Sequence, residues 1–303
     1  AAHRHRPEEA VTTAGEGAFE SRFVTAKDGL RLHARLYGRP AASRLPLVCL
    51  PGLSRNSGDF DVLARALASE RRVIALDYRG RGLSGWDANW QNYALPVELG
   101  DALSVLAEFG VARAVFLGTS RGGLMTMLAG MARPELLAGA ILNDIGPVIE
   151  GAGLARIRAY LGRLREPSTM DEAVALLKAA GAERFPALGD DDWRGQAESI
   201  WSVTDGVFAP AFDPALAKTL ENADFDAPLP TLWPQFDGLA GVPLMVIRGE
   251  HSDILSEATV AVMAERRPDM DIVTAAGQGH APLLTDAATI GRIAAFVRRR
   301  DAA

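Results

Sequence analysis

The chain has almost no cysteine. Cys49 is the single cysteine among 303 residues, which excludes an internal disulfide framework and a metal site built from cysteine ligands. Cys49 lies in the apolar run Leu47-Val48-Cys49-Leu50, a pattern typical of a buried strand. We therefore expect it to be a small, unreactive core side chain.

Long apolar runs are absent as well. No segment approaches the roughly 18–20 apolar residues that a bilayer-spanning helix needs, so we expect no membrane partner. Residues 1–17 are polar and lack the apolar centre of an intact signal peptide, which predicts a flexible N-terminal tail. A cytoplasmic location is the simplest expectation, and the sequence is also compatible with a leader that has been removed.

Excess positive charge is missing too. The formal net charge is -6, with acidic and basic residues interspersed, so the surface would repel phosphate backbones and nucleic acid is not expected as a partner. The composition, 48% hydrophobic and 23% charged, is typical of a globular enzyme. We expect a small-molecule substrate and a monomer or homodimer.

Short apolar runs alternate with amphipathic helical patterns along most of the chain. Two alternating segments, 19–25 and 30–37, are joined at Lys27-Asp28-Gly29, which is a hairpin signal. The continuous apolar runs that follow indicate strands buried on both faces, and hence parallel. They are 47–50, 73–76, 114–117, 140–142, 244–247 and 272–275. The pattern predicts an α/β fold with a doubly wound, mostly parallel sheet opened by an antiparallel hairpin.

One long interval breaks this alternation. Residues 147–238 show helical patterns and proline-bounded loops but no convincing strand, and they are rich in tryptophan and phenylalanine. We expect a mainly helical lid there, with most aromatic side chains in its own core and a minority lining a substrate pocket. Residues 18–146 and 239–300 would then form the α/β core.

A nucleophile pattern follows one of the predicted strands. Gly118-x-Ser120-x-Gly122 stands between the apolar run ending at Leu117 and a helical run that begins near Leu124. Small residues let strand and helix approach closely around a strained serine, and the helix N-terminus offers free N–H groups to developing negative charge. This context predicts a nucleophile elbow at Ser120 rather than an ordinary glycine-rich turn.

A serine nucleophile needs a base, and the chain has only five histidines. His3 and His5 lie in the polar tail, and His33 lies inside a predicted strand. His280 lies in a loop after the last predicted strand, which places it at the carboxyl edge of the sheet beside the elbow. We expect His280 to be the base and His251 to be an exposed neighbour.

The acid that orients the histidine should leave the same edge of the sheet. Asp253 follows the strand at 244–247 and is our first choice. Asp144 follows the strand that ends at Asn143 and is the rival. The order Ser, Asp, His along the chain is the one that this arrangement uses.

An oxyanion hole needs two backbone donors. We expect them to be the N–H groups of Arg121, directly after the nucleophile, and of Leu53, in the loop that follows the strand at 47–50. Gly52 permits a sharp turn in that loop, although Pro51-Gly52 is also a common turn dipeptide.

Together with a further motif, these residues resemble the α/β-hydrolase superfamily over residues 19–300. That motif is Asp77-x-Arg79-Gly80-x-Gly82-x-Ser84, which is similar to the family's D-x-R-G-x-G-x-S signature. The resemblance is to lid-bearing bacterial members that cleave esters, lactones or carbon–carbon bonds.

Two features depart from the family pattern. Pro51-Gly52 stands where His-Gly is usual, and Arg121 replaces a small or apolar residue. The Arg121 side chain has three open roles: to pack under the lid, to bind a substrate carboxylate, or to form a structural ion pair.

These motifs predict a serine hydrolase that transfers an acyl group to water from a carboxylic ester or lactone, without cofactor or metal. A carbon–carbon hydrolase of a diketone-like ring-cleavage product would use the same three side chains, and perhydrolysis is a further side activity of such sites. A hydrolase-fold receptor for a small ligand is the alternative from another class.

Overall fold

Eight strands form one mixed sheet in the computed structural model, which describes residues 19–41, 43–161, 164–225 and 227–301. The order across the sheet is β1-β2-β4-β3-β5-β6-β9-β10. β1 pairs antiparallel with β2 and β2 antiparallel with β4, while the pairs from β4 to β10 are parallel. The strands are β1 (Glu20–Thr25), β2 (Arg31–Tyr37), β3 (Leu47–Leu50), β4 (Val73–Asp77), β5 (Ala114–Thr119), β6 (Leu137–Asn143), β9 (Leu244–Gly249) and β10 (Asp271–Ala275).

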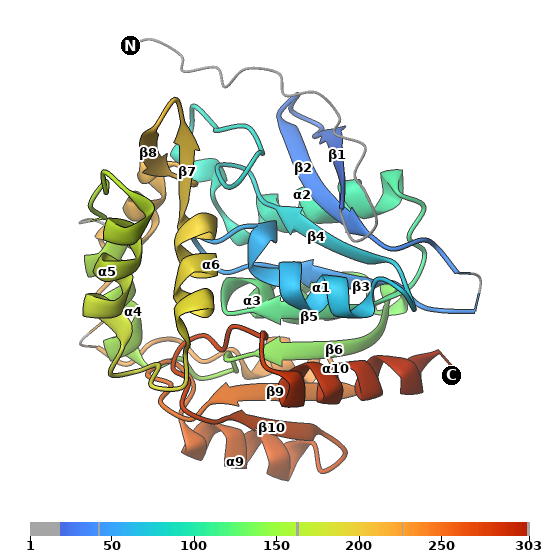
Figure 1. The fold of residues 1–303 in the computed structure, drawn as a ribbon. Coiled ribbons are helices and arrows are strands. Elements are labelled where there is room, and N and C mark those ends of the chain that lie inside the picture. The colour runs from blue at the N-terminus through green and yellow to red at the C-terminus, as the bar shows by residue number, and fades with distance from the viewer. Residues whose placement is uncertain (1–18, 42, 162–163, 226, 302–303) are drawn as a thin grey trace.

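Helices cover both faces of this sheet (Figure 1). One apolar cluster joins it to α2, α3 and α9, and a second joins it to α1 and α10. These helices are α1 (Asp61–Leu67), α2 (Leu95–Glu108), α3 (Arg121–Ala132), α9 (Glu257–Arg266) and α10 (Ala287–Arg300). The short 3₁₀ helices are η1 (Ser57–Phe60), η2 (Trp90–Asn92), η3 (Pro134–Leu136) and η4 (Pro214–Ala217).

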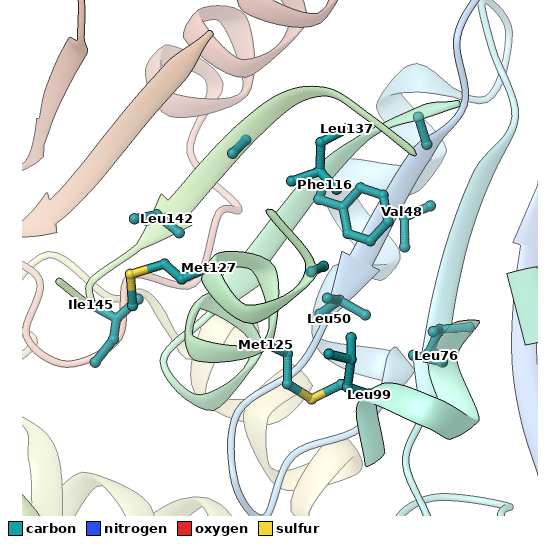
Figure 2. Close-up of a cluster of buried hydrophobic side chains, with 14 of the residues drawn as sticks. Val48, Leu50, Leu76, Leu99, Phe116, Met125, Met127, Leu137, Leu142 and Ile145 are labelled. Atoms are coloured by element: carbon teal, nitrogen blue, oxygen red, sulfur yellow. The ribbon is translucent and has the colours of Figure 1, made fainter. Parts of the chain in front are cut away.

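The central strands are buried on both faces because their side chains alternate between the two clusters. Val48 and Leu50 belong to the cluster under α2 and α3, whereas Leu47 and Cys49 belong to the other. Figure 2 shows the first cluster, in which Val48, Leu50 and Phe116 face the helix that carries Met125. The predicted doubly wound sheet with its opening hairpin is therefore confirmed.

Cys49 has no exposed surface, as its apolar surroundings predict. Burial raises the pKa of its thiol far above the usual range, so the side chain stays a neutral core group.

The segment between β6 and β9, residues 144–243, contains the interval that we call the insertion, residues 147–238. It lies beside the edge where β6 and β9 end (Figure 1). Its helices are α4 (Gly151–Leu161), α5 (Met170–Gly181), α6 (Asp190–Ile200), α7 (Lys218–Glu221) and α8 (Trp233–Asp237). It also contains a two-stranded antiparallel hairpin, β7 (Trp201–Thr204) and β8 (Val207–Pro210).

The expectation that this interval holds no strand is thus wrong at residues 201–210. The hairpin turns at Asp205-Gly206, and both residues have positive φ, at 52° and 77°. Asp-Gly is a preferred pair for a two-residue turn of this kind, so the sequence does contain the signal.

The buried aromatic side chains of the insertion fall into three groups. Trp193, Trp201 and Phe208 form a core within the insertion itself. Phe212 packs with Tyr93, which precedes α2, and Phe236 belongs to the main core beneath α3. Part of the aromatic content therefore attaches the insertion to the α/β core.

Candidate active site

Ser120 lies at the turn between β5 and α3 in a strained conformation, with φ 51° and ψ -113°. The flanking glycines permit this turn. A Cβ on Gly118 would lie 2.2 Å from the Gly122 carbonyl oxygen, and one on Gly122 would lie 2.0 Å from the Leu50 carbonyl oxygen. The predicted elbow geometry is therefore present at Ser120.

His280 reaches Ser120 from the loop after β10. The distance from His280 Nε2 to Ser120 Oγ is 2.9 Å. Asn143, at the end of β6, ties the two segments together, because its carbonyl accepts the Ser120 N–H and its side-chain amide donates to the Pro282 carbonyl at 3.0 Å. The structure thus brings the predicted nucleophile and base within hydrogen-bonding distance.

The carboxylate beside His280 is that of Asp144. His280 Nδ1 lies 2.8 Å from Asp144 Oδ2. The Gly249 N–H donates to the other carboxylate oxygen at 2.7 Å, and the Ser252 hydroxyl donates to Oδ2 at 2.6 Å. The Asp144 side chain has no exposed surface, and these three donors fix the position of its carboxylate. In that position it favours the His280 tautomer with the proton on Nδ1, which leaves Nε2 free to accept from Ser120.

Asp253, our first choice for this contact, makes no hydrogen bond to His280. Arg156 of α4 binds its carboxylate with two hydrogen bonds, at 2.6 and 2.8 Å. Burial acts to raise the pKa of Asp253, but the hydrogen bonds and charge of Arg156 outweigh it, so the pKa is lowered and the group stays ionised. The expected His280–Asp253 contact is therefore replaced by an ion pair between the insertion and the core.

Ser252 is a site residue that the sequence reasoning missed. Besides donating to Asp144, its hydroxyl accepts the N–H groups of Ile254 and Leu255, at 3.2 and 3.0 Å. A serine in a loop directly after a strand is a common turn former, and this is the signal that could have singled it out.

The two expected oxyanion donors flank Ser120. Arg121 is the first residue of α3, so its N–H has no acceptor within the helix. A Cβ built on Gly52 would lie 3.9 Å from Ser120 Cβ, which places the loop containing Leu53 next to the nucleophile. In the ranges that the structure describes, neither the Leu53 nor the Arg121 N–H donates to another protein group.

The Arg121 side chain forms an ion pair. Its Nε donates to Glu98 Oε2 at 2.6 Å, and its Nη2 donates to the Tyr93 carbonyl at 3.0 Å. Of the three roles left open by the sequence, the structure shows the structural ion pair.

Among the described residues, the other two histidines, His33 and His251, make no hydrogen bond to Ser120. His251 is exposed, as expected, and its N–H donates to the Gln278 carbonyl. His3 and His5 lie outside the described residues.

His33 forms a second Ser–His–Asp chain. It lies 2.7 Å from Asp77 Oδ2 and 3.0 Å from Ser21 Oγ. Ser21 is paired inside β1 rather than at the start of a helix, so this second chain has no free helix N–H groups beside its hydroxyl. The family-like motif starting at Asp77 therefore has a structural role, because Asp77 also accepts the N–H groups of Ser57 and Leu83.

The described residues contain neither a metal-binding cluster nor a membrane-spanning helix. No group of three or more His, Cys, Asp or Glu side chains in this part of the chain is arranged to hold a metal ion. None of its helices has both the length and the apolar character needed to cross a bilayer.

Comparisons with known proteins agree with this fold. The profile of the Alpha/beta hydrolase family matches residues 47–292. A 3-hydroxybutyrate-oligomer hydrolase of Cupriavidus necator is 35% identical over 279 residues, which cover 88% of this chain and 94% of that protein. A 2-(acetamidomethylene)succinate hydrolase of Mesorhizobium japonicum is 29% identical, over 76% of this chain and 79% of that protein.

A solved structure gives the same result. The crystal structure of an alpha/beta hydrolase from Novosphingobium aromaticivorans superposes with a TM-score of 0.87 at 40% identity, covering 94% of this chain and all of the other.

Proposed function

Since the chain belongs to the alpha/beta hydrolase family, we propose that it is a serine hydrolase that cleaves a carboxylic ester or lactone of a small molecule. The observation that carries this proposal is the continuous hydrogen-bonded chain Ser120–His280–Asp144, with joining distances of 2.9 and 2.8 Å. Such a chain activates a hydroxyl that is otherwise a weak nucleophile.

The geometry supports a mechanism with an acyl-enzyme. His280 Nε2 takes the Ser120 proton while Oγ attacks the carbonyl carbon, and Asp144 stabilises the imidazolium that results. The Leu53 and Arg121 N–H groups hold the oxyanion. His280 then returns the proton to the departing alkoxide. In the second half, His280 takes a proton from a water molecule that attacks the acyl-enzyme, and it passes this proton to Ser120 Oγ as the acid is released.

The relative from Cupriavidus necator supports the ester preference. An oligomer of 3-hydroxybutyrate is joined through hydroxyl and carboxyl groups, so its links are ester bonds, and this chain covers 94% of that protein. Short oligoesters of hydroxy acids are therefore the first substrates to test.

The insertion acts as a lid in this proposal. It contacts the core at two places near the site. Arg156 binds Asp253 next to the His280 loop, and Ser199 of α6 donates to Asp59, five residues after Ser54 in the Leu53 loop. A cover at these points would exclude water and shape the acyl pocket.

A turnover screen tests the function. Wild type and Ser120→Ala are compared on a hydroxybutyrate dimer, a chromogenic acyl ester, a lactone and a vinylogous diketone. We expect wild-type turnover of an ester or lactone that Ser120→Ala loses by on the order of 10⁴-fold or more.

Three outcomes contradict the proposal. Turnover of the diketone alone would assign carbon–carbon hydrolysis. Ligand-induced stabilisation without product would assign a receptor. Equal activity of wild type and Ser120→Ala would exclude Ser120 as the nucleophile.

A further inference from the structure

A buried carboxylate links the two segments that provide the oxyanion donors. Glu98, on α2, has no exposed surface. Its Oε2 accepts from Arg121 Nε at 2.6 Å, and its Oε1 accepts from Arg81 Nη1 at 2.5 Å. Arg81 in turn donates from Nε to the Leu53 carbonyl oxygen at 2.7 Å. This bridge of hydrogen bonds therefore connects Leu53 with Arg121, the two residues whose N–H groups are the proposed oxyanion donors.

We propose that Glu98 is a positioning residue that holds the Leu53 loop and the start of α3 at the separation which the oxyanion hole needs, acting through Arg81 and Arg121. This inference rests on the proposed serine-hydrolase function. It adds a residue that touches neither the substrate nor the reacting atoms.

The two donors need such a bridge because they come from segments far apart in the chain. Leu53 follows β3, and Arg121 follows β5. Each N–H must point at one small oxygen at about 2.7–3.1 Å, and a misplacement of about 1 Å can cost about 10²-fold in rate. Arg81 fixes the carbonyl of Leu53, and this limits rotation of the backbone that presents the Leu53 N–H.

The surroundings make the bridge rigid. Arg81 and Glu98 are fully buried, and Arg121 keeps only 14% of its side chain exposed. Hydrogen bonds between ionised groups are about twice as strong as neutral ones, and burial removes competing water. Burial lowers the pKa of Arg81, and the charge of Glu98 offsets that shift only in part. An arginine guanidinium nevertheless stays protonated in proteins, so Arg81 remains a donor.

The bridge also accounts for both departures from the family pattern. Pro51 removes a side-chain hydrogen bond in the Leu53 loop, where His-Gly is usual, and Arg81 provides a different support for that loop. Arg121 replaces a small residue after the nucleophile, and its side chain is the second arm of the Glu98 bridge.

The test is Glu98→Gln, which keeps the size of the side chain and removes its charge. With a chromogenic ester that wild type turns over, we expect kcat to fall by about tenfold or more while KM changes by less than about threefold, because the oxyanion forms only in the transition state. The pH profile of kcat should keep its midpoint, since the His280–Asp144 pair is untouched.

Asp101→Asn is the matched control. Asp101 is also a buried carboxylate on α2, bound by Arg79 with two hydrogen bonds at 2.7 and 2.8 Å, but it contacts neither Arg81 nor Arg121 through its side chain. We expect it to lower the melting temperature like Glu98→Gln and to leave kcat unchanged. This comparison separates positioning from stability alone.

If Glu98→Gln does not fold, Arg121→Met gives the answer, because it cuts one arm of the bridge and keeps the backbone N–H. A fall in kcat at constant KM supports the bridge. The inference is overturned if a folded Glu98→Gln or Arg121→Met keeps wild-type kcat, or if the Asp101→Asn control loses as much. Its failure differs from failure of the proposed function, in which wild type itself shows no turnover that depends on Ser120.

Discussion

The Asp144 carboxylate accepts three hydrogen bonds, one of them from His280, whereas Asp253 makes none to His280. His280, Ser252 and the Gly249 N–H all reach the Asp144 carboxylate within 2.8 Å. Asparagine at position 144 would present an amide to His280 Nδ1 and favour the wrong tautomer. We expect Asp144→Asn to lower kcat by about 10⁴-fold, as for other triads of this kind. Steady-state kinetics on an ester measures the effect.

Asp253→Asn is the matched control for that variant. Its carboxylate is paired with Arg156 and makes no hydrogen bond to His280, so we expect kcat to change by no more than about threefold, because a partly exposed ion pair contributes little. A severe loss in Asp253→Asn beside a mild one in Asp144→Asn would reverse the assignment.

Ser252 is one hydrogen bond farther from the reacting atoms than Asp144. Its hydroxyl donates to the same oxygen of Asp144 that receives His280 Nδ1. Since a hydrogen bond to a charged group contributes about 1.5–3 kcal/mol, we expect Ser252→Ala to lower kcat by about tenfold. Ser256→Ala, which removes the cap of α9 instead, provides the kinetic control and should keep wild-type kcat. Equal kcat for wild type and Ser252→Ala would show that Asp144 needs no such support.

Residue types and positions along the chain predict the nucleophile and the base more securely than the acid. Gly-x-Ser-x-Gly after an apolar strand is compatible with few local backbone structures, and His280 is the one histidine that follows the last strand. Asp144 and Asp253 both follow parallel strands that are neighbours, with Asn143 paired to Ile247. Which carboxylate turns inward depends on the backbone after each strand, including a φ of 57° at Asp144, and the sequence does not specify that turn.

At the scale of elements, the elbow depends on the contact of α3 with β3. A Cβ on Gly122 would lie 2.0 Å from the Leu50 carbonyl oxygen, which is backbone and cannot move aside. We expect Gly122→Ala to lower the free energy of unfolding by about 2–3 kcal/mol, as overpacking does. Urea denaturation measures this.

Gly100→Ala is the helical control, because nothing lies within 4 Å of a Cβ at that position of α2. Alanine stabilises a helix by about 0.5–1 kcal/mol relative to glycine, so we expect this variant to be at least as stable as wild type. Unchanged or increased stability of Gly122→Ala, as expected for Gly100→Ala, would show that the contact with Leu50 does not restrict residue 122.

The elements of the core were easier to predict than those of the insertion. Core strands are continuous apolar runs because helices cover both faces of the sheet, and such runs are visible in a sequence. β7 and β8 are four residues each and form only a two-stranded sheet, with Val203 and Val207 exposed, so neither shows a buried strand pattern. Their turn, Asp205-Gly206, was the stronger signal.

At the scale of the whole molecule, the Arg156–Asp253 pair joins the insertion to the core. The pKa of Asp253 is lower in the folded protein than its ordinary value of 3.8. The pair therefore stabilises the fold above about pH 4, and this contribution is lost as the pH falls through the lowered pKa. We expect wild type to exceed Asp253→Asn in stability by about 0.5–1 kcal/mol at pH 7 and this difference to shrink as the pH falls below about 4.

Denaturation curves of both proteins at pH 7, 5 and 3 test this linkage. A difference that grows as the pH falls would contradict it, because the Asp253 carboxylate would then be more stabilising when protonated.

The central claim concerns one hydroxyl, and the described residues contain two Ser–His–Asp arrangements. Labelling by a fluorophosphonate, followed by peptide mass spectrometry, tests it most directly. The account predicts one adduct per chain, on the peptide that contains Ser120, and no adduct in Ser120→Ala. Absence of labelling in an active wild-type protein, or an adduct on Ser21 in place of Ser120, would contradict it.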